Sequence, residues 1–305
     1  MKSTFRLTGG DGLPWAINRI IDNAGLDTAF GALRGPIALN ADWRVISEFV
    51  IDHRLIGMCS RGVFPGREPS LDALHGLDST AAIGRPYPYV EKCEGFAHCF
   101  RNPERYLPTG LPATLLSESD FKDPEWVWKV GCHGTVAPKT WDIIFVCGRG
   151  MYHEVTKNAS LGMSTIGRVC SELGFRALVV GCSAANYIDP GRGSVDVVDE
   201  LPWHELMECL ARSKSALFPN HMDPSPRLLA EALCLDVPVL VNRDILGGWK
   251  YVNSDTGSFF DTEADAVEWS RLMHVNSYHP RAWFSANYGP TRAGQRLAEF
   301  LASLG

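Results

Sequence analysis

The sequence contains no apolar run that approaches the roughly 20 residues that a membrane-spanning helix needs. Its first eight residues lack the apolar core of a signal peptide. No Cys-x2-Cys pair occurs among its nine cysteines, so we expect reduced thiols and no zinc site. Together these absences predict a cytoplasmic protein without a transmembrane segment.

Other missing patterns exclude further classes. The net charge of −6 argues against nucleic-acid partners, which require basic surfaces. No complete Gly-x-Gly-x-x-Gly follows a predicted strand, which disfavours a nicotinamide dehydrogenase. The nine histidines show no His-x3-His spacing, and no convincing Asp-x-Asp follows a strand. We therefore expect neither a metal ion nor another cofactor.

What is present is the composition of a globular protein, with 305 residues, 45% of them hydrophobic and 21% charged. In the second half, short apolar runs alternate with helical patterns, which predicts a parallel sheet with ligands at the carboxyl ends of its strands. The expected strands are residues 141–147, 176–180, 195–198, 215–218, 238–242 and 257–260. The expected helices are residues 163–173, 203–211, 262–273 and a stretch opening at Ser225-Pro226.

The first half is less regular. Residues 4–8 predict a strand, Gly9–Gly12 a glycine-rich turn, and residues 14–23 an amphipathic helix with Ile17, Ile20 and Ile21 on one face. Continuous apolar runs predict strands of a parallel sheet at residues 36–39, 55–59, 96–100 and 113–116. Residues 62–91 read as a long irregular segment, and residues 134–139 as a hinge. We therefore predict domains at 1–138 and 139–280, followed by a terminal segment, 281–305.

The stretch from Phe218 to Asn242 carries the clearest signal of a ligand site. A strand end is followed by a loop with Asp223 and by the helix opening at Ser225-Pro226, where serine is expected to cap the first turn. The free amides around Arg227 would then form an anion seat at the helix N-terminus. An ordinary helix cap of any α/β domain is the alternative.

This stretch resembles the acid-x7-acid motif of GT-B glycosyltransferases, in particular the retaining family-four type. The matching residues are Pro219-Asn220, Asp223-x7-Glu231 and Asp236-Val237-Pro238-Val239. The chain differs from the family in having Asp223 for a glutamate and Asp236 for a glycine. Aspartate tolerates the left-handed conformation, so the second difference is a mild one. The resemblance implies an α/β fold of two doubly wound, Rossmann-like domains facing across a cleft, the first binding the acceptor and the second the nucleotide-sugar donor. It also implies that the terminal segment, 281–305, crosses back to the N-terminal domain.

A second motif lies at the start of the second half, where Gly148-Arg149-Gly150 follows a strand and Lys157 comes eight residues after Arg149. It is similar to the family signature whose arginine and lysine hold the donor diphosphate. Two fixed cations and a helix N-terminus can neutralise a leaving phosphate without a metal ion. A solvated pair of cations near a strand end is the alternative.

The resemblance also implies roles for other residues. Glu231 would bind the ribose hydroxyls, and Asp223 the hydroxyls of the transferred sugar. The remaining donor-binding candidates lie near the diphosphate or the base, or in the glycine-rich turn after the first strand. They are Gly10, Gly148, Gly181, Ser183, Leu201, Ser225, Pro226 and Arg227. On the acceptor side, Asp11 or His53 would be the general base if the reaction inverts. If it retains, Asp11 is a helix cap, and the acid-x7-acid motif favours retention.

The sequence therefore predicts a metal-independent glycosyltransferase, either a hexosyl- or a pentosyltransferase. It would move a sugar from a nucleotide-sugar donor, with UDP favoured over GDP, to a hydroxyl of a glycan or glycoprotein acceptor. Two alternatives stay open. One is a nucleotide-sugar epimerase or hydrolase of the same fold, and the other a carbohydrate-binding protein without catalytic activity.

Overall fold

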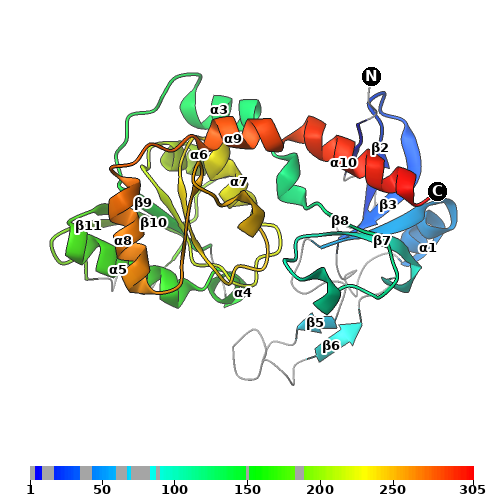
Figure 1. Cartoon of the computed structure of the whole chain (residues 1–305), viewed down its shortest axis with the longest axis horizontal. Coiled ribbons are helices and arrows are strands. Elements are labelled where there is room, and N and C mark those ends of the chain that lie inside the picture. The colour runs from blue at the N-terminus through cyan, green and yellow to red at the C-terminus, as the bar shows by residue number, and fades with distance from the viewer. Residues whose placement is uncertain are drawn as a thin grey trace. The chain divides into compact units, whose positions relative to one another are not determined.

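The computed structural model describes residues 4–8, 17–34, 43–59, 67–69, 83–86, 90–148, 151–182 and 189–305. The chain divides into a first unit, Met1–Phe121 with Tyr288–Gly305, and a second unit, Lys122–Asn287. Each unit contains a six-stranded sheet with helices packed on it (Figure 1). This division falls before the predicted hinge because helix α3 (Pro124–Cys132) packs against helices of the second unit.

The second unit is built on one parallel sheet in the order β11-β10-β9-β12-β13-β14. Every neighbouring pair in it is parallel, as the alternating pattern predicts. The strands lie within a residue or two of their predicted positions: β9 (Ile143–Val146), β10 (Arg176–Val180), β11 (Ser194–Val198), β12 (Ala216–Phe218), β13 (Val239–Asn242) and β14 (Gly257–Phe260). The doubly wound, α/β prediction is therefore confirmed for this unit.

The helices of the second unit begin and end at residues suited to those positions. Gly174 closes α5 in a left-handed conformation, with φ of 72°, and Thr262 forms a capping box with Asp265 at the start of α8. Asp236, expected to tolerate a left-handed cap, has φ of 56° after α7. The helices are α3, α4 (Met151–Thr156), α5 (Ala159–Leu173), α6 (Trp203–Ala211), α7 (Arg227–Cys234), α8 (Glu263–Met273) and α9 (Pro280–Asn287), with the 3-10 turn η5 (Trp249–Tyr251).

The first unit has a mixed sheet in the order β1-β2-β3-β4-β7-β8. From β3 to β8 the strands are parallel as predicted, but β1, β2 and β3 pair antiparallel. A separate antiparallel pair lies within the segment predicted to be irregular. The elements are β1 (Arg6–Thr8), β2 (Ile17–Ile21), β3 (Asp27–Leu33), α1 (Trp43–Asp52), β4 (Arg54–Met58), β5 (Arg67–Pro69), β6 (Ile83–Pro86), η1 (Val90–Lys92), β7 (Cys93–His98), η2 (Pro103–Arg105), β8 (Ala113–Leu115) and η3 (Glu118–Phe121).

The predicted helix at residues 14–23 is wrong, because Ile17–Ile21 is strand β2. Ile17 and Ile20 are both buried although they are three residues apart, which imitates helical spacing. Asn18, on the opposite face of the strand from Ile17, is buried as well, so burial on both faces removes the alternation that marks a half-buried strand. The turn that follows, in which the amide of Asp22 donates to the carbonyl of Leu26 and Gly25 has φ of 82°, marks a hairpin.

The C-terminal helix α10 (Pro290–Ser303) belongs to the first unit and lies over its sheet (Figure 1). Its buried residues Leu297 and Leu301 share a hydrophobic core cluster with Ile20, Ile56 and Ala97 of the sheet. At Gly294 the amide of Phe5 donates to the helix carbonyl at 3.1 Å. The helix is therefore part of this unit's hydrophobic core.

Two further predictions, the strand at residues 36–39 and the turn at Gly9–Gly12, lie outside the described residues. Within the described part of the chain, no helix has both the length and the apolar character needed to cross a membrane. All nine cysteines are free thiols, as expected.

Candidate functional site

The candidate site lies in the second unit, where the carboxyl ends of the parallel strands meet at one edge of the sheet. Gly148 follows β9 and Gly181 follows β10, with φ of 84° and 75°. A Cβ atom on Gly181 would lie 3.0 Å from the amide nitrogen of Gly148, so the two loops touch through their backbones. Beside them, burial raises the pKa of Cys147 to about 12, which keeps its thiol protonated. The two predicted glycines thus lie together.

The loops after β12 and β13 are joined at the same edge. The amide of Leu246 donates to the carbonyl of His221 at 2.9 Å, and that of Gly247 to the carbonyl of Asp223 at 3.0 Å. Burial lowers the pKa of His221, so its imidazole is neutral at pH 7. These bonds fix the loop that carries the acid-x7-acid motif.

Gly247 offers a test of that fixed position. A Cβ atom there would lie 1.9 Å from the carbonyl oxygen of Pro224, so Gly247→Ala must push the two loops apart. We expect a loss of about 1–3 kcal/mol in the free energy of unfolding, the usual cost of overpacking, measured by urea denaturation. Gly134→Ala separates the two costs of an added Cβ, because no atom lies within 4 Å of it but its φ of 82° is left-handed, which costs alanine about 1–2 kcal/mol. Gly247 has no left-handed φ, so a loss of less than about 1 kcal/mol in Gly247→Ala would contradict the steric argument.

Lys157 and Asp223, 66 residues apart in sequence, form an ion pair at this edge, with Nζ 2.5 Å from Oδ2. Lys157 lies in the turn between α4 and α5, and Asp223 in the loop after β12. The same oxygen of Asp223 accepts from the side-chain amide of Asn220 at 3.0 Å, and Oδ1 accepts from the amide of Ser225 at 3.3 Å. The side chains of Lys157 and Asp223 are 22% and 15% exposed, so the pair is sheltered but reachable from solvent.

The start of α7 differs from the prediction. The helix begins at Arg227 with Pro226 in the cap position, one residue later than predicted, and the proline offers no side-chain hydrogen bond at that cap. Ser225 is buried, and its amide donates to Asp223. Arg227 is exposed at the first position of the helix. The helix N-terminus nevertheless lies beside the ion pair, where its dipole favours an anion.

Glu231, one turn into α7, is 4% exposed and has two partners on Oε1. Lys122 forms an ion pair with this oxygen, and the indole Nε1 of Trp203 donates to it at 3.0 Å. Leu201 lies half-buried in the loop that leads from β11 to Trp203. The carboxylate predicted to meet ribose is therefore held in place by protein groups.

The sequence analysis assigned no role to two of these residues, Asn220 and Lys122. Asn220 was part of the motif, and its position at the end of a buried strand was the available signal. Lys122 reaches Glu231 across 109 residues of sequence, so no local pattern could identify it.

Four predicted site residues, Gly10, Asp11, Arg149 and Ser183, lie outside the described residues. Among the residues that are described, no group of three or more His, Cys, Asp or Glu side chains converges as metal ligands would.

His53 lies in the first unit, before β4, and so at the amino edge of its parallel strands. Its Nε2 is 2.9 Å from Oδ2 of Asp27, and its ring stacks on Phe49 at 3.9 Å between centroids. Burial raises the pKa of Asp27, but hydrogen bonds from His53 and Arg19 outweigh it and lower the pKa overall. Ligands of open α/β sheets bind at the opposite edge. This position gives His53 a structural role in joining β3 to α1.

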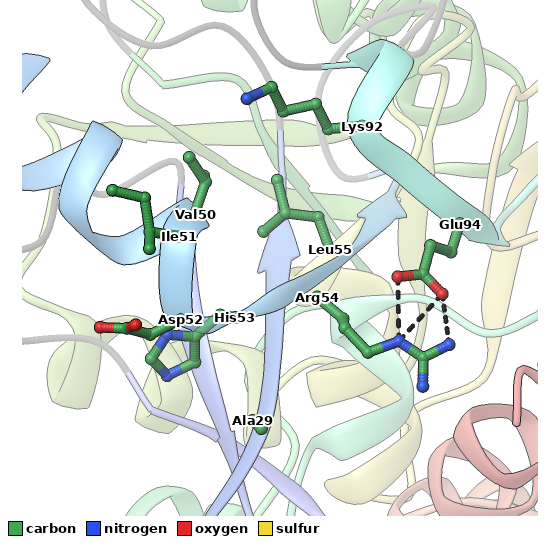
Figure 2. A pocket seen from close by; sticks show the side chains of 9 residues that line it. All are labelled: Ala29, Val50, Ile51, Asp52, His53, Arg54, Leu55, Lys92 and Glu94. Atoms are coloured by element: carbon green, nitrogen blue, oxygen red, sulfur yellow. Dashed lines mark hydrogen bonds and ion pairs between the residues drawn. The ribbon is translucent and has the colours of Figure 1, made fainter.

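His53 also lines a pocket of about 490 Å³, formed by residues 50–55 with Ala29, Lys92 and Glu94. Figure 2 shows Arg54 and Glu94 facing each other within it, where the Arg54 Nε lies 2.9 Å from Oε1. Because Arg54 donates to it, the pKa of Glu94 is lowered. The positive charge of Arg54 is balanced by the carboxylate of Glu94. Arg54 also donates a hydrogen bond to the carbonyl of Leu304 at 2.9 Å.

No protein-family model and no curated protein matches the sequence. Solved structures do match, however. AviGT4, a glycosyltransferase involved in avilamycin A biosynthesis, is 15% identical with a TM-score of 0.56, over 83% of this chain and 69% of its own. The pneumococcal O-GlcNAc transferase GtfA, solved with UDP and GlcNAc, is 8% identical with a TM-score of 0.57, over 99% and 70%. S. aureus TarM, solved as a mutant with fondaparinux, α-GlcNAc-glycerol and UDP, is 11% identical with a TM-score of 0.59, over 97% and 69%.

The chain has the GT-B fold. At these identities the likeness establishes the fold alone, and the predicted two Rossmann-like domains are confirmed as architecture. In the second unit of this GT-B chain, Lys157, Asp223 and the start of α7 come together at the carboxyl edge, the place where ligands of such sheets bind.

Proposed function

We propose that the protein is a glycosyltransferase that moves a sugar from a nucleotide-diphosphate donor to a hydroxyl of a glycan acceptor. The observation that carries this proposal is the meeting of Lys157, Asp223 and the N-terminus of α7 at one sheet edge of a GT-B fold. A cation and a helix N-terminus together suit a diphosphate.

The chemistry follows from the charge that transfer creates. When the sugar leaves, negative charge builds on the distal phosphate, and a fixed ammonium lowers the energy of that state. An ammonium has three N–H donors. One of those of Lys157 is taken by Asp223, which leaves the others for phosphate oxygens. We propose that Arg149, which comes three residues after β9 in the sequence, adds a second cation and makes a metal ion unnecessary.

Asp223 would then hold Lys157 in place and meet the hydroxyls of the transferred sugar. The side-chain amide of Asn220, itself 2% exposed, fixes the carboxylate for both tasks. The Asp223-x7-Glu231 motif favours transfer with retention, in which no general base is required of the acceptor side. UDP is the favoured nucleotide, because two of the similar structures were solved with UDP.

Binding of the nucleotide is the first test. Calorimetry with UDP, GDP, ADP and CDP should give one strong binder, with UDP expected, and the affinity should be the same with and without a chelator. No binding by any of the four would remove the donor site and with it the proposal.

Turnover is the second test. The donor sugar of the matching nucleotide should be consumed faster when glycan acceptors are added, and the product should keep the anomeric configuration of the donor. Consumption that is independent of acceptors would indicate a hydrolase or epimerase of the same fold. Nucleotide binding without any turnover would indicate a carbohydrate-binding protein.

A further inference from the structure

Two buried cysteines lie at the ends of neighbouring strands of the second unit. Cys147 follows β9 and Cys182 comes two residues after β10, and the two residues are 1% and 3% exposed. The strands pair in parallel, and the amide of Cys147 donates to the carbonyl of Val180 at 3.0 Å. The two thiols are hydrogen-bonded to each other and belong to one hydrophobic core cluster. The pairing of the strands therefore holds these thiols together.

A third sulfur atom reaches this pair from helix α5. The Sγ of Cys182 lies 3.4 Å from the Sδ of Met163. Helix α5 comes close to the sheet here because Gly162 has no side chain, and a Cβ atom on it would lie 2.4 Å from the ring of Phe145 in β9. Met163 is the next residue and packs against the core cluster that contains both cysteines. Two thiols and one thioether thus meet at the carboxyl ends of β9 and β10.

The protonation of Cys147 separates two roles that such a pair can have, oxidation to a disulfide and binding of a metal ion. Burial raises the pKa of Cys147 to about 12, and the neighbouring thiol adds to the rise. This thiol is therefore protonated at pH 7, and oxidants that react with thiolates would attack it slowly. A metal ion that binds thiolate strongly displaces the proton itself. The thioether of Met163 contributes nothing to a disulfide, but it is a ligand for soft metal ions.

We propose that Cys147, Cys182 and Met163 bind a soft monovalent metal ion, Cu(I). Thiolate and thioether ligands select Cu(I), whereas structural Zn²⁺ sites take four ligands, one more than this group offers. Each thiol loses its proton to solvent when the ion binds, and no electron is transferred. The site does not depend on the proposed sugar transfer, because no step of that reaction uses these residues.

The geometry needs only a small adjustment. Metal–sulfur bonds of about 2.3 Å in a three-coordinate site place the sulfur atoms about 4 Å apart. The sulfur atoms of Cys182 and Met163, at 3.4 Å, would therefore separate by about half an ångström. Methionine has an unbranched side chain with three rotatable bonds, which permits such a shift.

Anaerobic titration of the full chain with Cu(I), in competition with a chromophoric chelator, measures the site. We expect one equivalent to bind more tightly than any other. Cys147→Ala and Cys182→Ala each remove a thiolate and should weaken this binding by more than about 100-fold, beyond the usual effect of losing an outer-shell partner. Cys59→Ala is the matched control and should bind normally, because this thiol of the first unit is equally buried and also interacts with a second cysteine, Cys99.

Two further measurements do not depend on how well the cysteine variants fold. Met163→Leu conserves the side-chain volume, so it should fold normally and weaken Cu(I) binding by about tenfold or more. X-ray absorption at the copper edge of the natural protein should show three sulfur neighbours. Nitrogen or oxygen ligands in that spectrum, unchanged affinity in Met163→Leu, or loss of the tight equivalent in Cys59→Ala would overturn the inference.

Discussion

Lys157→Ala is expected to reduce kcat/KM with the nucleotide-sugar donor by about a hundred- to a thousand-fold, equivalent to about 2.7–4 kcal/mol, the cost of removing one preorganised electrostatic group. The reason is that the fold brings the ammonium of Lys157, from the turn between α4 and α5, to Asp223 beside the start of α7. The measurement is steady-state transfer, together with calorimetry for the nucleotide alone.

Stability should change far less than activity. After Lys157→Ala, the carboxylate of Asp223 keeps its bonds from Asn220 and Ser225, so the expected loss in the free energy of unfolding is about 1 kcal/mol. Lys214→Ala is the matched control, because Lys214 forms a similar pair with Asp142 at 2.7 Å but at the amino edge of the sheet. Normal transfer by Lys157→Ala with a large loss of stability would show that this pair is structural.

The strands of the second unit could be predicted because the central ones are buried on both faces. Such strands appear as continuous apolar runs, and β10 and β14 begin and end at the predicted residues. The first unit departs from these rules at β2, where Ile17, Asn18 and Ile20 are all buried. The spacing of apolar residues along the sequence cannot distinguish such a strand from a helix.

The candidate site, too, could be predicted only where a local sequence pattern identifies its residues. Lys157 and Asp223 could be proposed together because each lies at a fixed distance from a strand that a motif identifies. The partners of Glu231 could not, because Lys122 and Trp203 reach it through packing of α3, α6 and α7. Burial also could not be predicted at Glu231. It lies four residues after Arg227, so helical spacing places both charged side chains on one face, but only Arg227 is exposed.

Breaking the ion pair between Lys122 and Glu231 is expected to cause a large loss in the free energy of unfolding. The Glu231 side chain is 5% exposed and that of Lys122 24%, so Lys122→Met leaves a buried carboxylate without its cation. Losing one partner of a buried pair typically costs about 3–5 kcal/mol. We expect the free energy of unfolding to fall toward the lower end of this range, because Trp203 still donates to Glu231. Urea denaturation measures it, with Lys129→Met on the exposed side of α3 as the control.

The double variant Lys122→Met with Glu231→Met separates stability from function. Replacing both charges by apolar groups should recover most of the lost stability, because no unpaired charge remains. Nucleotide affinity should stay below that of the natural protein, because ribose loses the carboxylate proposed to accept from its hydroxyls. Recovery of both quantities would mean that Glu231 serves only the packing of α6 against α7. A double variant as unstable as Lys122→Met alone would instead contradict the electrostatic account of the single variant.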